Sequence, residues 1–548
     1  MKRYLGWMVI LMLVATAFYT IALDYGRPLP EYSPSTVKNA WLNAATVYHP
    51  DAFAYAGIGY QMLVKRTFNP HYYNNPSLNI YTDMFVFWIS GSLALPHNAT
   101  YGTREVAPFS VYVMAQFLSA LFSVITVALV YSIGRMVFDR TVGFVAAALA
   151  AFSPLSVQHA HYATPNAETI TMATAALLLA IVILKRRSPH WIIYIAAGLL
   201  VGLTMSARYN AVVVGVVTIA ALVTAWLSHR HWQPVLMALV AMPIGFVIGT
   251  PGAIFAYRNF IDDVKQILVW YKVQGGGPGF TSNYGVYYHW LYTVEFVVGP
   301  VAILLALIGL GVALLRWRTS WQKAWVAGVF ILYLIIYTIL ALPGKRLNAN
   351  LLLPLIAPIA LFAAYGGLFL WRRLKSGRQF WAVIGVVALL AWPVYLSICF
   401  SQLLATRDSR ELAQAWIYQH VPKETNVELL GSYNIALDPL DYHFTNTYSG
   451  TAKLDDPFWQ SDIIVYSDSS AFVTLRDRAV TENPDDITNT IAVADKLKNH
   501  WIELANFPRL YWPGQNTPPD DVSYWHQMGI TVYCNPTKCP VSQPATGQ

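Results

Sequence analysis

The sequence predicts an α-helical polytopic membrane protein with about eleven transmembrane helices and a small C-terminal α/β domain. Of the 548 residues, 56% are hydrophobic and only 12% are charged, whereas soluble globular proteins carry roughly 25% charged residues. Apolar runs of about 20 residues recur through residues 1–404 and are absent from 405–548. The 19 tryptophans are typical of aromatic belts at the two bilayer surfaces. We therefore expect a membrane domain over 1–404 and a separate domain over 405–548.

The predicted spans begin with an uncleaved anchor from Tyr4 to Leu23. The others lie, within a few residues, at 109–133, 141–158, 166–184, 191–207, 211–227, 234–256, 291–315, 325–343, 350–371 and 380–404. The first long loop, residues 24–107, contains two short predicted helices at 51–66 and 77–95. The second is apolar enough to resemble a span, but it carries Asp83, and counting it as a span would reverse the orientation of every later loop. We therefore expect it to lie in the membrane interface.

The distribution of charge sets the expected orientation. Residues 1–404 carry a net charge of +16 and residues 405–548 a net charge of −8. Basic residues fall in alternate loops, and only Asp139 of the 28 acidic residues falls in a loop of that set. We therefore expect a plasma or inner membrane protein with a cytoplasmic N-terminus and an extracytoplasmic C-terminal domain. Topology explains the basic half of the chain, so no nucleic-acid partner is expected.

The C-terminal residues 405–548 are sufficient for one small domain. Their pattern predicts a helix from Asp408 to His420, strands at Val427–Leu430 and Ile463–Tyr466, and a helix over 491–504. Cys534 and Cys539 would close a very small loop. A disulfide and two free thiols are both compatible with the sequence.

Ionisable residues at the mouths of membrane helices are candidates for function, because their burial requires a partner. Asp51 follows His49 and Pro50 at the start of a predicted helix. An aspartate there is either a plain N-cap or a general base. On the same predicted outer side, Arg208 and the pair Lys345 and Arg346 break the positive-inside pattern. Such cations either extend to the interface from helix ends or bind an anionic group such as a phosphate.

The connection between the third and fourth predicted spans carries several polar side chains. Thr164 and Pro165 indicate a helix start, which places Asn166 and Glu168 in the first helical turn. His159 and His161 with a carboxylate offer donors for a divalent metal, although their spacing is not a zinc signature. The sequence therefore assigns no certain cofactor and leaves a divalent metal open.

Six stretches between about residues 45 and 360 form a recognisable pattern through their order and spacing. They are His49-Pro50-Asp51, the run from Asn69 to Leu78, the run from Phe117 to Phe138, the run from Ala150 to Pro165, Ser206 to Asn210, and Lys345-Arg346. Together they resemble the GT-C glycosyltransferases of the protein O-mannosyltransferase-like group, which use polyprenyl-phosphate-linked sugars and include the aminoarabinose transferases of lipid A.

The resemblance implies that Asp51 is the catalytic base and that the basic outer residues hold the lipid phosphate. The chain departs from the family where Ala52 replaces the usual Glu after the first Asp, and where Asn166 replaces a frequent Asp. We expect Glu168 to supply part of the missing carboxylate function. The expected substrate-binding residues are His49, His71, Arg104, Asn166, Arg208, Lys345 and Arg346.

The sequence thus predicts a membrane glycosyltransferase that inverts the anomeric centre. It would move a mannose-like hexose or a pentose from a polyprenyl-phosphate donor to a hydroxyl of a protein or lipid acceptor on the extracytoplasmic side. The alternative is a non-catalytic polyprenyl-lipid binder or transporter on the same scaffold. The absence of a Glu after Asp51 favours that alternative, whereas the confinement of the charged residues to one face argues against a transporter. An oligosaccharyltransferase-like enzyme is a weaker third hypothesis, because the C-terminal region lacks a Trp-Trp-Asp-like stretch.

Overall fold

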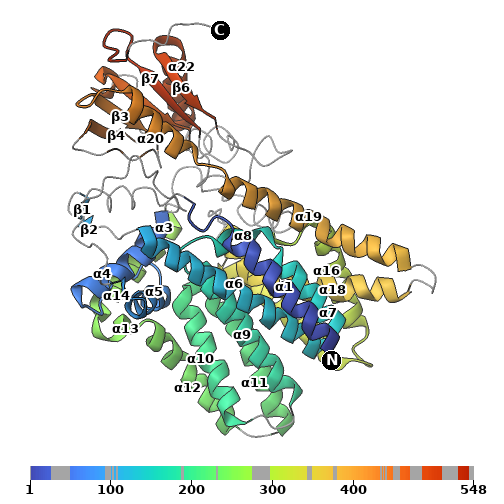
Figure 1. The fold of residues 1–548 in the computed structure, drawn as a ribbon. Helices are drawn as coiled ribbons and strands as arrows, with labels where there is room; N and C mark the ends of the chain where they lie inside the picture. The colour runs from blue at the N-terminus through green and yellow to red at the C-terminus, as the bar shows by residue number, and fades with distance from the viewer. Residues whose placement is uncertain are drawn as a thin grey trace.

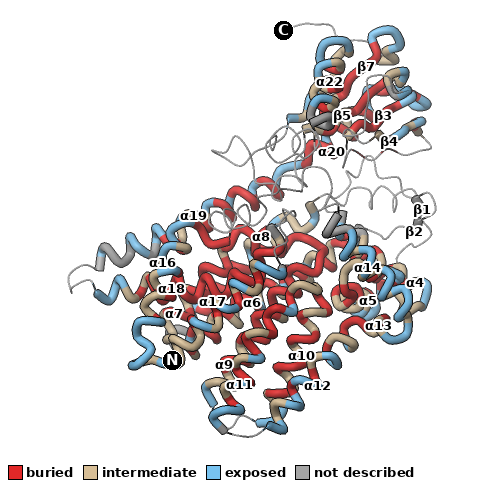
Figure 2. Tube along the Cα trace, turned by 180° about the vertical axis from the view of Figure 1, so that it is seen from behind, coloured by how far each residue is buried: buried red, intermediate tan, exposed pale blue. Residues whose placement is uncertain are grey.

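We analysed a computed structural model of the chain. It describes residues 2–25, 50–92, 100–101, 104–105, 109–186, 190–229, 232–273, 297–341, 349–373, 379–431, 435, 437, 441–447, 457–468, 484–508 and 529–541. Helices form a bundle, and a small sheet near the C-terminus lies beyond one end of it (Figure 1). Buried residues fill the inside of the bundle and, as a separate group, the inside of the sheet region (Figure 2).

Each of the eleven predicted spans contains a helix. These helices are α1 (Lys2–Thr20), α6 (Phe109–Val137), α7 (Arg140–Ala151), α8 (Pro154–Ala160), α9 (Asn166–Lys185), α10 (Trp191–Ala207), α11 (Gly215–His229), α12 (Gln233–Gly249), α16 (Pro300–Leu315), α17 (Trp321–Ala341), α18 (Ile356–Arg373) and α19 (Gln379–Ala405). Within the described residues, six helical segments are long and apolar enough to cross a membrane, or seven if α7 and α8 are one bent span. The chain is therefore a multi-pass membrane protein. The count of eleven spans stays a prediction.

The predicted continuous span at 141–158 is wrong. It is broken between α7 and α8, which are bent by 58°. Ser153 is extended (φ −60°, ψ 124°) because the ring of Pro154 disfavours a helical conformation in the residue before it. The predicted span at 234–256 is likewise interrupted. Its helix α12 ends at Gly249, and a short helix α13 (Gly252–Phe255) follows Pro251.

Close packing of α10 on α12 fixes the end of α10. A Cβ atom on Gly202 would lie 2.0 Å from the carbonyl oxygen of Met242, and one on Gly245 would lie 2.3 Å from that of Leu199. Only glycine permits this backbone approach. The contact holds the last turn of α10 next to α12, and Arg208 follows directly after that turn.

The first loop contains the two expected short helices. The first runs through α3 (Pro50–Ala52), a π-helical turn (Phe53–Gly57) and α4 (Ile58–Lys65), and the second is α5 (Leu78–Ile89). At 12 residues, α5 is too short to cross a bilayer. It exposes Trp88 and Ile89 and buries Asp83, which is typical of a helix with one face toward lipid and one toward protein. A further helix, α14 (Tyr257–Val273), lies in the loop between the predicted spans at 234–256 and 291–315, where no helix was predicted.

The C-terminal region contains a five-stranded mixed sheet. Its strands are β3 (Asn426–Leu430), β4 (His443–Thr447), β5 (Ile463–Ser467), β6 (Ile502–Phe507) and β7 (Ile530–Cys534), in the order β4-β3-β5-β7-β6. β3 is parallel to β4 and β5, whereas β7 is antiparallel to β5 and β6. The helices α20 (Ser409–His420) and α22 (Pro484–His500) lie next to the sheet, with α20 near β6 and β7 and α22 near β6. The two predicted strands and the first predicted helix are confirmed within one residue.

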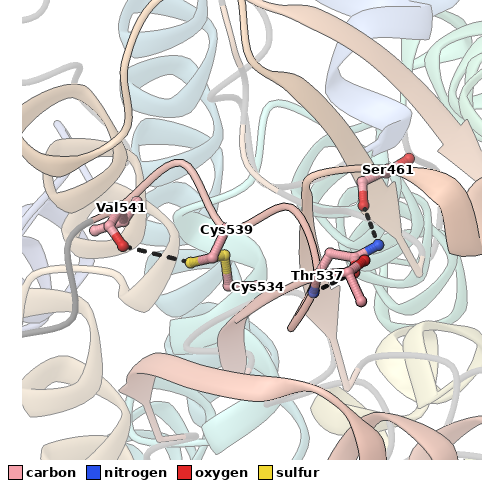
Figure 3. The surroundings of a disulfide bond; sticks show 6 residues. Ser461, Cys534, Thr537, Cys539 and Val541 are labelled. Atoms are coloured by element: carbon pink, nitrogen blue, oxygen red, sulfur yellow. Dashed lines mark hydrogen bonds between the residues drawn. A yellow bond between two sulfur atoms is a disulfide. The ribbon is translucent and has the colours of Figure 1, made fainter.

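The predicted helix over 491–504 is wrong at its end. The helix α22 stops at His500, and residues from Ile502 form β6, because pairing with β7 outweighs the local helical pattern there. Cys534 and Cys539 form a disulfide, which closes the turn after β7 (Figure 3). In the same turn, Asn535 Nδ2 donates a hydrogen bond to the carbonyl oxygen of Ser461 at 3.2 Å. The boundary between the two domains at residue 405 stays a prediction.

Candidate functional site

Asp51 lies at the exposed start of a helix whose other side is buried. It occupies the first turn of α3, and a π-helical turn follows at once. π-helical turns are rare and frequently occur at functional sites. The neighbouring Ala52 and Ala56 are buried in one apolar cluster with Ala163, from the loop between α8 and α9. The buried side of the Asp51 helix therefore packs against the loop that leads to Asn166.

Asn166 is the centre of a buried polar network. Its side-chain oxygen accepts a hydrogen bond from Arg208 Nη1 at 2.8 Å. Its Nδ2 lies 3.0 Å from His159 Nδ1 and 3.1 Å from Thr164 Oγ1. Asn166 is 3% exposed, and Arg208 is half-buried. The amide thus orients the guanidinium and leaves its charge intact, whereas an Asp at this position would neutralise that charge.

Glu168 faces α5 across a second polar contact. Thr82 Oγ1 donates a hydrogen bond to Glu168 Oε1 at 2.8 Å, and the Asn79 side chain also interacts with this carboxyl. Asp83 lies on the same face of α5, four residues after Asn79. Both Asp83 oxygens and Glu168 Oε2 are buried and have no hydrogen-bond partner among the described residues. Burial, and to a lesser degree the nearby Glu168, raise the pKa of the Asp83 carboxyl.

The loop before α5 is held by side chains from α14 and the end of α10. Tyr73 donates its backbone N–H to Asp263 Oδ2 at 2.7 Å, and its carbonyl oxygen accepts from Tyr209 Oη at 2.9 Å. The ring of Tyr73 packs over Gly252, where a Cβ atom would lie 1.9 Å from Tyr73 Oη. His71 is exposed in the same loop with a left-handed backbone (φ 49°). The loop thus connects α5 with α14 and with the segment that directly follows α10.

The remaining predicted site residues are placed only in part. Arg104 belongs to a two-residue strand, β2 (Arg104–Glu105), that pairs with β1 (Thr100–Tyr101), and the position of its side chain is not described. His49, Lys345 and Arg346 lie outside the described residues. The structure therefore brings together Asn166, Arg208 and the Asp51 helix, and separately Glu168 with α5.

The two histidines suggested as metal ligands are engaged differently. His161 is buried, and its ring nitrogens lie 2.7 Å and 2.8 Å from the carbonyl oxygens of Val157 and Ile21. Neither nitrogen points to a carboxylate. His159 Nδ1 contacts Asn166. Within the described part of the chain, no three His, Cys, Asp or Glu side chains come close enough to hold a metal ion.

The contact of Glu168 with Thr82 on α5 is a feature that the sequence did not predict. The two residues are 86 positions apart, and only their polarity in apolar surroundings distinguishes them. Asn79, Thr82 and Asp83 are spaced so as to share one helical face, and that spacing is the signal that could have indicated a polar contact.

The chain is similar to known proteins in part of its sequence and in its fold. The model of the family described as dolichyl-phosphate-mannose-protein mannosyltransferase matches residues 109–254, which include Asn166, Glu168 and Arg208. The structure of ArnT from Cupriavidus metallidurans in the apo state has a TM-score of 0.50 and 14% identity, and the match covers 96% of this chain and 98% of that chain. No curated protein matches the sequence.

Two further solved structures have lower scores. The archaeal oligosaccharyltransferase AglB from Archaeoglobus fulgidus matches with a TM-score of 0.47 and 12% identity over 95% of this chain and 77% of that chain. The arabinofuranosyltransferase AftD from Mycobacteria matches with a TM-score of 0.39 and 14% identity over 96% and 41%. At these identities, structural similarity concerns the fold. The chain has a fold similar to that of ArnT, and its resemblance to the polyprenyl-phosphate-sugar-dependent GT-C glycosyltransferases is confirmed.

Proposed function

We propose that the protein is a membrane glycosyltransferase that moves a sugar from a polyprenyl-phosphate donor to an acceptor hydroxyl on the extracytoplasmic side. The observation that carries this proposal is the packing of the Asp51 helix on the loop that leads to the Asn166–Arg208 pair. An acid and an oriented cation at one end of the bundle supply the two groups that the reaction needs. The match to the mannosyltransferase family over residues 109–254 favours a mannose-like sugar.

In the proposed reaction, Asp51 accepts the proton of the acceptor hydroxyl as the hydroxyl oxygen attacks the anomeric carbon. The new glycosidic bond forms while the bond between that carbon and the phosphate oxygen breaks, and the anomeric centre is inverted. The electron pair leaves with the polyprenyl phosphate. Arg208, together with Lys345 and Arg346, stabilises the charge that develops on the phosphate. The acceptor hydroxyl belongs to a protein or a lipid.

Asn166 orients Arg208, and its neutral amide leaves the guanidinium charge available for the phosphate. His49, His71 and Arg104 are proposed to contact the sugar or the acceptor. Glu168 is proposed as the second acid of the site. Because two buried carboxyls disfavour simultaneous ionisation, Asp83 and Glu168 would carry one negative charge between them rather than two. The C-terminal residues 405–548 would position the acceptor above the bundle.

The test is incorporation of labelled mannose from polyprenyl-phosphate mannose by the purified protein in lipid, with a broad acceptor pool and with water as the default acceptor. Asp51→Asn should slow transfer by about 10²-fold to 10⁴-fold. Asp24→Asn is the matched control, because Asp24 is exposed near the end of α1. Full transfer by Asp51→Asn would refute the assignment of the base. Retention of donor with no turnover by the wild type would instead support the non-catalytic lipid binder.

A further inference from the structure

Four cationic side chains converge at the end of the bundle that is remote from Asn166. Lys185 lies in the last turn of α9, Arg316 caps the C-terminus of α16, Lys323 lies in the first turn of α17, and Arg372 lies in the last turn of α18. Lys323 interacts electrostatically with the other three and, more strongly, with Asp139. We call these four residues the basic cluster. Lys185 and Asn166 are at opposite ends of α9, which at 1.5 Å per residue separates them by about 28 Å.

The basic cluster is not neutralised by acids. Arg372 pairs with Asp139 at 2.7 Å, and this pair is largely exposed. Lys185 donates a hydrogen bond to the carbonyl oxygen of Met136. Within the described part of the chain, Lys185, Arg316 and Lys323 form no ion pair with a carboxylate. One acid therefore faces four cations.

The helix dipole favours three of these cations but not the fourth. Lys185, Arg316 and Arg372 lie at helix C-termini, where the helix dipole favours a positive charge. Lys323 lies at a helix N-terminus, where the dipole opposes it, and no acidic residue occupies that turn. An ordinary interfacial lysine would extend its ammonium group into water. A bound anion would remove this conflict.

Aromatic rings hold the Lys323 ammonium in place. Its Nζ lies 5.9 Å from the ring centre of Phe138 and 5.3 Å from that of Tyr365, and these two rings stack at 4.4 Å. The side chain is half-buried. Arg316 likewise lies 4.9 Å from the ring centre of Phe369, one turn after Tyr365. Two of the four cations, Lys323 and Arg316, thus lie against a floor of aromatic rings.

An apolar crevice of about 40 Å³ adjoins this floor. Phe138 belongs to both, and Trp325 and Phe362 line the crevice from α17 and α18. The lining is almost wholly apolar, so the crevice is suited to a few carbon atoms of an acyl chain rather than to water. A ligand that fits both features is anionic at one end and apolar at the other.

We propose that the basic cluster and the adjoining crevice bind an anionic phospholipid. Its phosphate would contact Lys323, Arg316 and Lys185, and part of an acyl chain would enter the crevice beside Phe138. On the predicted topology this lipid comes from the cytoplasmic leaflet. The site goes beyond the proposed sugar transfer, because it lies at the other end of the bundle from Arg208. Inorganic phosphate shares the headgroup chemistry but cannot fill the crevice, so we commit to the lipid.

The experiment titrates the purified full-length protein in maltoside micelles with dioctanoyl phosphatidylglycerol, dioctanoyl phosphatidylcholine and inorganic phosphate by calorimetry. The phosphatidylglycerol should bind at least tenfold more tightly than the phosphatidylcholine. Lys323→Gln should weaken its binding at least tenfold. Arg318→Gln is the matched control, because Arg318 is exposed between the same two helices and contacts the ring of its neighbour Trp317; it should change binding less than twofold.

Three outcomes would overturn the proposal. Equal affinity for the two lipids would show that the site does not select an anionic headgroup. Equal losses of affinity in Lys323→Gln and Arg318→Gln would show that binding depends on the general positive charge of this region and not on the basic cluster. Displacement of the lipid by an equal concentration of inorganic phosphate would assign the site to a soluble anion. If Lys323→Gln fails to fold, Arg316→Gln takes its place, with the same tenfold loss expected. The binding assay needs no sugar donor, so its result is independent of the proposed transferase activity.

Discussion

Asp83 offers a prediction in which stability should increase when a buried carboxyl is removed. Its two carboxyl oxygens are buried without a hydrogen-bond partner among the described residues, and Glu168 Oε2 is likewise buried and unpaired there. A buried polar group left unpaired costs about 1–3 kcal/mol, and a charged group costs more. The side chain of Asn is nearly isosteric with that of Asp, is neutral, and its amide can donate to Glu168. We therefore expect Asp83→Asn to stabilise the protein by about 1–3 kcal/mol at neutral pH.

The pH dependence follows from the sign of the pKa shift. Burial raises the pKa of Asp83 in the folded state above that of the unfolded chain. The wild type therefore has its full stability below the unfolded-state pKa and loses it as the pH rises through the folded-state pKa. Asp83→Asn does not titrate at this position. Its advantage over the wild type should be smaller at pH 5 than at pH 8.

Cys399 provides the readout. It is buried in α19, and it is free, whereas Cys534 and Cys539 are joined. A thiol-reactive dye should therefore report thermal unfolding of the bundle. Asp24→Asn, at an exposed position, should change stability by less than about 0.5 kcal/mol. A lower unfolding midpoint for Asp83→Asn at both pH values would refute the reasoning, because it would mean that the Asp83 carboxylate has a cationic partner. Loss of transfer together with a higher midpoint would show that the unpaired carboxyl serves function.

Three further predictions concern single contacts. Arg208→Gln should raise the KM for the lipid-linked donor by about tenfold or more, because a charge-assisted bond to phosphate is lost; an unchanged KM in steady-state kinetics would exclude Arg208 from the phosphate site. Gly252→Ala should destabilise the loop before α5, which carries Tyr73, by about 1–3 kcal/mol, because the new Cβ would lie 1.9 Å from Tyr73 Oη. Limited proteolysis within this loop should accelerate, and a cleavage rate equal to that of the wild type would contradict the contact. Asp139→Asn should cost at most about 1 kcal/mol, because the pair with Arg372 is 55% and 38% exposed; a larger loss in the thermal assay would show that the pair is coupled to the bundle.

The sequence was informative wherever a local signal decided the structure. The length of the apolar runs predicted the spans, and each of them contains a helix. The change from apolar residues to Arg208 predicted the end of α10 at Ala207 correctly. Thr164 and Pro165 predicted the start of α9 correctly to within one residue, although Pro165 rather than Thr164 occupies the capping position. The clustering of the outer polar residues was predicted from topology alone, and the structure brings Asn166 and Arg208 into contact.

The sequence was less informative where distant segments decide the structure. The bend at Ser153 has a visible signal in Pro154, but helices can also continue through proline, and the surrounding packing settles which occurs. Ile502 to Leu504 belongs to the predicted helix over 491–504, and pairing with β7 makes Ile502–Phe507 a strand instead. The contact of Glu168 with Thr82 joins two helices 86 residues apart. The spacing of Asn79, Thr82 and Asp83 indicates a polar face on α5, but a single sequence does not identify the residue that this face contacts.

The most direct test of the account is the single-turnover rate of sugar transfer in protein already loaded with polyprenyl-phosphate sugar, with bound donor measured in the same sample. The account predicts that Asp51→Asn retains its donor and transfers it about 10²-fold to 10⁴-fold more slowly than the wild type, the range expected for loss of a general base. Transfer by Asp51→Asn at the rate of the wild type, with equal donor bound, would contradict the account.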